Sequence, residues 1–83
     1  MRFGFYLPTR GPVATPPALT AFAQKGEELG FTSVMIADHV VFPVKIDSPY
    51  PYTVGGAFPG HGDQLEQLTL ASFIAAKTKR IRL

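Results

Sequence analysis

The first half of the chain alternates between short apolar runs and one amphipathic stretch, which predicts a strand, a helix and a second strand. Residues 3–7 are apolar and stop at a proline, as expected of a buried strand. Thr15 and Pro16 are residue types that cap and start a helix, and apolar residues then recur at helical spacing. We expect Gly30 to end this helix in a left-handed conformation. Residues 33–37 are almost wholly apolar, which is typical of a parallel strand covered on both faces.

The second half opens with a long segment that has neither a helical nor a strand pattern. Residues 40–62 hold several prolines and aromatic side chains, and ordered loops of this length are usually functional. Asp63 and Glu66 have the spacing of an acidic capping box, so we expect a helix from Asp63 to about Thr78. Residues 80–83 alternate between basic and apolar side chains, which predicts a third strand.

The predicted order of elements is that of an α/β protein whose parallel strands are joined by right-handed crossovers. An open doubly wound sheet and a closed (β/α)8 barrel both accommodate this order. The turn at residues 8–12 has one glycine where a dinucleotide-binding turn needs three, which favours the barrel. We therefore expect residues 1–83 to be the amino-terminal portion of a single TIM (β/α)8 barrel domain, truncated after its first three strand–helix elements.

Composition and charge narrow the possible partners. With no cysteine, disulfides and thiolate metal sites are excluded, and a net charge of +2 is too small to indicate a nucleic-acid partner. No apolar run approaches the roughly 20 residues that span a bilayer. We therefore expect a cytoplasmic protein without a membrane or nucleic-acid partner. The apolar share of 46% beside 17% charged residues suits a segment covered by neighbours, and we expect a homo-oligomer.

Asp38 and His39 directly follow the second predicted strand and are the leading candidates for chemistry. In parallel α/β folds, the loops after the strands form the mouth of the active site. Histidine exchanges a proton near neutral pH, and an ionised carboxylate accepts hydrogen bonds from a ligand. Neighbouring strand residues point to opposite faces, so both side chains reach one ligand only if the strand ends there. The alternative is that Asp38 caps or salt-bridges a loop while His39 is a rim residue.

Further candidates lie near the same predicted mouth. Arg10, after the first strand, would meet an anion or form an exposed salt bridge. His61, between two glycines, is either a loop residue or a second imidazole for a metal site shared with Asp38 or Asp63. The spacing lacks an established zinc pattern, so we assign no metal ligand. Three loop aromatics would either line a site for a flat ring or anchor the loop: Tyr50, Tyr52 and Phe58.

Five segments, in this order, resemble the luciferase-like monooxygenase superfamily, and most closely its branch of oxidoreductases that use the deazaflavin coenzyme F420. They are Met1–Pro8, Glu27–Val34, Ala37–Val40, Ser48–Tyr52 and Thr78–Leu83. The resemblance covers the whole chain but only the amino-terminal part of a family member. It implies a full (β/α)8 barrel that binds F420, or alternatively FMN, in its mouth.

The resemblance also implies an activity and roles for two residues. The activity is hydride transfer between the deazaflavin or flavin ring and a small-molecule substrate, or a related monooxygenation. Asp38 would hydrogen-bond the cofactor, and His39 would be the catalytic acid or base. The family's phosphate-binding residues come later than Leu83, which implies that the isolated piece is inactive. The alternatives are a metal-dependent TIM-barrel hydrolase using Asp38, His39 and His61, and a non-catalytic barrel fragment stable only in an oligomer.

Overall fold

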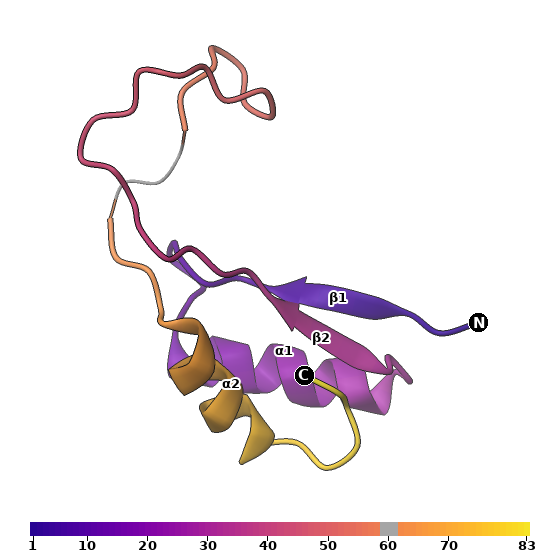
Figure 1. Cartoon of the computed structure of the whole chain (residues 1–83). Helices are drawn as coiled ribbons and strands as arrows, with labels where there is room; N and C mark the ends of the chain where they lie inside the picture. The colour runs from indigo at the N-terminus through magenta and orange to yellow at the C-terminus, as the bar shows by residue number, and fades with distance from the viewer. Residues whose placement is uncertain (59–61) are drawn as a thin grey trace.

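The computed structural model describes residues 1–58 and 62–83 of the chain. Two parallel strands and two helices form the body, in the order β1 (Gly4–Leu7), α1 (Pro16–Glu28), β2 (Ser33–Ile36) and α2 (Gln67–Ala75). The strands lie side by side with both helices on one face of the sheet (Figure 1). This mixed α/β arrangement confirms the predicted parallel pairing, whereas the closed barrel stays a prediction.

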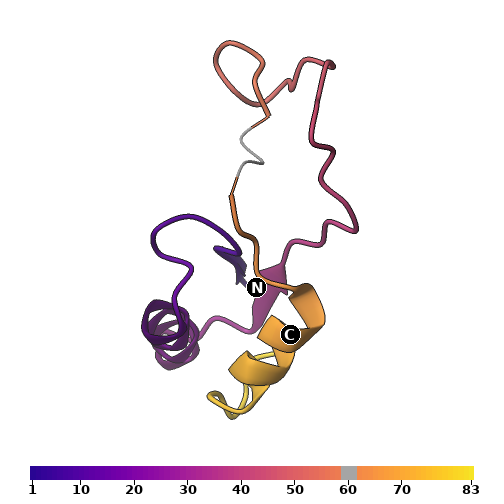
Figure 2. The same cartoon turned by 90° about the vertical axis from the view of Figure 1, so that its left-hand side faces the viewer.

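The long segment after β2 extends away from the body before the chain returns to α2 (Figures 1 and 2). The radius of gyration is 14.5 Å. A compact chain of this length would have a value of about 12 Å. The projecting loop accounts for the difference, because the molecule measures 42 Å along its longest axis and 20 Å along its shortest.

Helix α1 has the ends that the sequence predicts. The Thr15 hydroxyl accepts a hydrogen bond from the Ala18 amide at 3.4 Å, and Pro16 occupies the first helical position. At the other end Gly30 has φ 89°, and its amide donates to the Glu27 carbonyl while the Phe31 amide donates to the Gly26 carbonyl. This pair of bonds is a Schellman motif, which glycine favours because it has no Cβ to clash in the left-handed region.

Helix α2 begins later than the capping-box spacing predicts, so that prediction was wrong. The N-cap is Glu66 rather than Asp63, and the Glu66 carboxylate accepts hydrogen bonds from the amides of Leu68 (2.8 Å) and Thr69 (2.7 Å). The hydroxyl of Thr69 donates to the same carboxylate at 2.6 Å. Residues 63–66 are extended because their backbone is paired elsewhere. The helix also ends earlier, at Ala75 instead of about Thr78.

The predicted third strand is present as a single parallel bridge between Ser33 and Arg82. The Val34 amide donates to the Arg82 carbonyl at 2.7 Å, and the Arg82 amide donates to the Thr32 carbonyl at 3.0 Å. Ser33 also pairs with Gly4 of β1, so β2 lies between β1 and the end of the chain. The other two predicted strands are each one residue shorter than expected.

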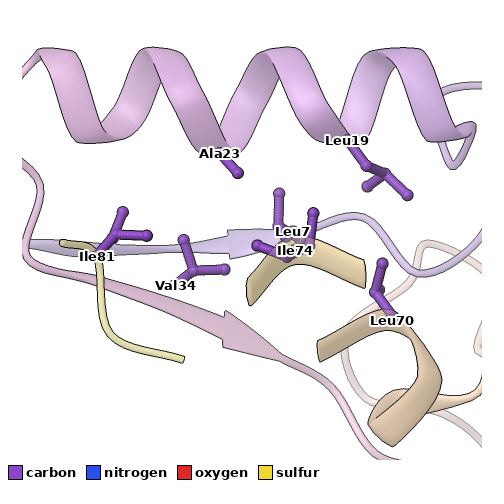
Figure 3. Packing of buried hydrophobic residues seen from close by; sticks show 7 residues of the cluster. All are labelled: Leu7, Leu19, Ala23, Val34, Leu70, Ile74 and Ile81. Carbon is purple, nitrogen blue, oxygen red and sulfur yellow. The ribbon is translucent and has the colours of Figure 1, made fainter. Parts of the chain in front are cut away.

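The core lies between the sheet and the two helices. Side chains of both helices, both strands and the last residues of the chain meet there (Figure 3). The buried apolar residues are Leu7, Leu19, Ala23, Val34, Leu70, Ile74 and Ile81. On the opposite face of the sheet, Tyr6 and Met35 keep 69% and 38% of their surface exposed, so the described residues leave this face largely uncovered. Among the described residues, neither helix is long and apolar enough to cross a bilayer.

The carboxylate of Glu27 fastens the turn before the last residues to helix α1. It accepts hydrogen bonds from three consecutive amides, those of Lys79 (2.9 Å), Arg80 (2.6 Å) and Ile81 (2.8 Å). These bonds favour the ionised form and lower the pKa of Glu27 from 4.5 to about 2, with the Arg80 amide contributing most. The bonds hold the chain where Ile81 enters the core.

A folded-state pKa below the unfolded one means that the Glu27 contribution to stability is present above about pH 4.5 and is lost as the pH falls towards 2. We expect Glu27→Gln to lower the urea midpoint at neutral pH and to flatten its decline in acid. Glu28→Gln is the matched control, since Glu28 makes only an exposed ion pair with Lys25 among the described residues. Equal acid profiles for wild type and Glu27→Gln would contradict this assignment.

Two residues of α2 test the position of the core. Ile74 is fully buried and Leu68 is 70% exposed. Ile74→Ala should therefore destabilise the fold by about 2–5 kcal/mol through lost burial and the cavity left behind. Leu68→Ala on the same helix should change the free energy of unfolding by less than about 0.5 kcal/mol. Chemical denaturation followed by circular dichroism measures both, and similar losses would contradict the packing.

The two carboxylates at the start of α2 distinguish the observed cap from the one predicted by spacing. Replacing Glu66 by alanine removes the acceptor for two otherwise unpaired helical amides, so the urea midpoint should fall. Asp63→Ala removes the same charge three residues earlier and should leave the midpoint close to that of wild type. The reverse order of effects would restore Asp63 as the cap.

Candidate functional site

Asp38 and His39 lie just beyond the carboxyl end of β2, which stops two residues earlier at Ile36. Since the chain has left the strand, the alternation of faces no longer separates the two side chains. Both line one cavity of about 490 Å3, together with residues from the segment that leads into α2. The structure therefore places both residues on one cavity, and their functional roles stay a prediction.

Gln67, the first residue of α2, holds the carboxylate of Asp38. With its amide nitrogen turned towards Asp38, it donates to the two carboxylate oxygens at 2.9 and 3.1 Å. Asp38 also lines a second cavity, of about 630 Å3, between β2 and α2, where Tyr6, Met35 and Leu68 are among the lining residues. Asp38 is thus exposed between two cavities, and its carboxylate is hydrogen-bonded by Gln67.

His39 is fixed by aromatic contacts. Its ring stacks on Phe42 with centroids 4.7 Å apart and planes 22° apart, and the Phe58 ring lies 6.1 Å away. Gln64 approaches from the segment before α2, with its side-chain nitrogen 3.5 Å from Nδ1 of His39. The imidazole therefore has one face against a ring and one nitrogen beside an amide.

The loop aromatics contact one another. Tyr50 packs edge-on against Phe58 at 4.9 Å and against Tyr52 at 5.4 Å, and Phe58 stacks with Phe42 at 5.8 Å. Neither tyrosine nor Phe58 is among the residues that line the cavity holding Asp38 and His39. Of the two roles left open by the sequence, these contacts favour anchoring the loop.

Arg10 lies at the end of β1, where the sequence places it, and its guanidinium is 5.4 Å from the centre of the Phe58 ring. The ion pairs among the described residues are Lys25–Glu28 and Lys45–Asp47, so the exposed salt bridge considered for Arg10 is not formed within them. Its Nη1 is shielded from solvent without a hydrogen-bond partner. Arg10 and His39 thus approach the same aromatic ring.

The metal hypothesis depends on His61, which lies outside the described residues. Within residues 1–58 and 62–83, no three histidine or acidic side chains gather as a metal-binding group. Asp63, Glu66 and His39 line the cavity with Asp38, but within the described part of the chain no three of them lie close enough to hold a metal ion.

Three residues of the site were missed by sequence reasoning. Phe42 follows the Asp-His pair closely, and its position in a run of apolar residues before a proline gave no sign of a contact with His39. Gln64 and Gln67 were read as part of the predicted helix, where a glutamine is an ordinary surface residue. Both act on partners more than 20 positions away, as the separation of 25 residues between Gln64 and His39 illustrates.

Comparisons of this chain with protein-family models, with curated proteins and with solved structures give no match.

Proposed function

We propose that the chain is the amino-terminal part of a luciferase-like (β/α)8 oxidoreductase that uses F420, or alternatively FMN, to exchange hydride with a small-molecule substrate. The observation that carries this proposal is the position of Asp38 and His39, side by side on one cavity beyond the carboxyl end of β2. The five-segment sequence resemblance supplies the family, and this is the end of a parallel strand where such enzymes hold their active sites.

The exposed face of the sheet supports the barrel in this proposal. Tyr6 and Met35 are neighbours across β1 and β2. Both are large hydrophobic side chains, and both are exposed. In a closed barrel this face would point inwards and be filled by side chains from the other strands. The bridge from Ser33 to Arg82 already extends the parallel order beyond β2.

The chemistry of the cavity can be compared with the needs of the cofactor. Its volume of about 490 Å3 lies within the usual range for ligand sites, about 300–1,000 Å3. A flavin-like ring is flat and carries N–H donors, which suits the Phe42 ring and the Asp38 carboxylate. The described lining residues include Asp38, Asp63 and Glu66 but no lysine or arginine, so the cavity fits the ring of the cofactor and not its phosphates.

The two leading residues then divide the work. The bound cofactor would supply hydride transfer at its ring. Asp38 would accept a hydrogen bond from a ring N–H, replacing or sharing the bond that it now receives from Gln67. His39 would donate or accept the proton that accompanies the hydride, with its ring kept in place by the stack on Phe42.

Titration of the protein with F420 and separately with FMN, followed by absorbance and fluorescence, tests the proposal. Asp38→Ala should weaken binding about 10-fold or more, because a hydrogen bond to a charged acceptor contributes about 1.5–3 kcal/mol. His39→Ala should keep the cofactor, and in the intact gene product it should lose turnover. Asp47→Ala is the control, since Asp47 pairs with Lys45 on the projecting loop.

The outcomes separate the hypotheses. If neither cofactor binds the intact gene product, the oxidoreductase proposal is wrong. Loss of cofactor binding in His39→Ala with unchanged binding in Asp38→Ala would overturn the assigned roles. Zinc binding that depends on both histidines, without cofactor binding, would favour the metal-dependent hydrolase in its place.

A further inference from the structure

Gln64 reaches the site from a segment that belongs to neither a strand nor a helix. Its backbone forms an antiparallel bridge with Arg10, and the next amide, that of Leu65, donates to the Thr9 carbonyl at 2.9 Å. Thr9 is buried, so this pairing fastens the segment to the end of β1. The bridge explains why residues 63–66 are extended. It also fixes the backbone position from which the Gln64 side chain extends.

From this point the Gln64 side chain extends to the end of β2. Its Nε2 lies 3.5 Å from Nδ1 of His39, which is long for a hydrogen bond. Hydrogen bonds of catalytic groups are often long before a ligand binds and shorten in the complex. The imidazole is stacked on Phe42 with ring centroids 4.7 Å apart.

We propose that Gln64 is a positioning residue that sets the tautomer of His39. With the amide nitrogen of Gln64 facing the ring, as the structure places it, the group beside Nδ1 is a donor, and Nδ1 accepts with its lone pair. In the neutral ring the proton is then on Nε2, and Nε2–H is the group left for a ligand. The tautomer follows from this orientation of the Gln64 amide, and its meaning for catalysis rests on the proposed function of His39.

The charged groups around the site do not set the tautomer of His39. Asp38, Asp63 and Glu66 line the same cavity, but Asp38 is paired with Gln67, Glu66 caps α2, and Asp63 makes no hydrogen bond to the His39 ring among the described residues. The guanidinium of Arg10 lies over Phe58. In the described part of the chain, the polar contact of the His39 ring is the one with Gln64. An amide whose nitrogen faces the ring favours one tautomer without adding a charge, whereas a carboxylate at this place would add one.

Nitrogen-15 spectra of the full chain, recorded in mildly alkaline buffer where histidine rings are neutral, test the proposal directly. His39→Asn identifies which of the two histidine signals belongs to His39. The wild-type ring should show a protonated Nε2 and an unprotonated Nδ1. A protonated Nδ1 of His39 in the wild type would overturn the proposal.

Two substitutions then vary the group that faces Nδ1. Gln64→Glu replaces the donor by an acceptor, so the proton should move from Nε2 to Nδ1. Gln64→Met removes the donor at similar volume, so the preference for Nε2–H should weaken and both tautomers should appear. A residue that merely fills space would leave the tautomer unchanged in both variants, and that result would contradict the proposal.

The result is independent of cofactor binding. If the tautomer behaves as expected but neither F420 nor FMN binds, the proposed oxidoreductase function fails and the role of Gln64 stands. If a cofactor binds and the tautomer of His39 is unchanged by the substitutions at position 64, the proposed function stands and Gln64 is not a positioning residue.

Discussion

The parallel pairing of β1 with β2 is the constraint on which the rest of the structure depends. Parallel strands need a crossover between them, and α1 supplies it, so that one face of the pair is covered and both strands end at the same edge. This edge carries Arg10 after one strand and the Asp-His pair after the other. An antiparallel pair would have placed these residues at opposite edges.

A second set of contacts closes the site around that edge. The long loop begins after His39 and ends at Gln64. There the backbone of Gln64 and Leu65 pairs with the segment that follows β1. Aromatic contacts between Phe42, Phe58 and Tyr50 tie the loop to the imidazole. The loop therefore both contributes to the lining of the cavity and contacts the histidine ring.

Features that depend on neighbouring residues could be predicted well. Thr15 and Gly30 mark the ends of α1 because a cap and a left-handed glycine are decided within one helical turn. The start of α2 could not be predicted in this way. Asp63 and Glu66 have equally suitable side chains, and the choice between them is made by the pairing of Gln64 and Leu65 with the end of β1.

The sequence by itself determined the parallel α/β pattern, the ends of α1 and the place of Asp38 and His39 after β2, since these follow from local periodicity and residue type. Tertiary structure alone decided the partners of those two residues. Gln67 reaches Asp38 and Gln64 reaches His39 across a loop whose path no local pattern specifies, and the course of the chain after His39 brings Phe42 against its ring. The physical reason is that hydrogen bonds and ring stacking act over a few ångströms, and only the folded chain brings such distant positions within that range.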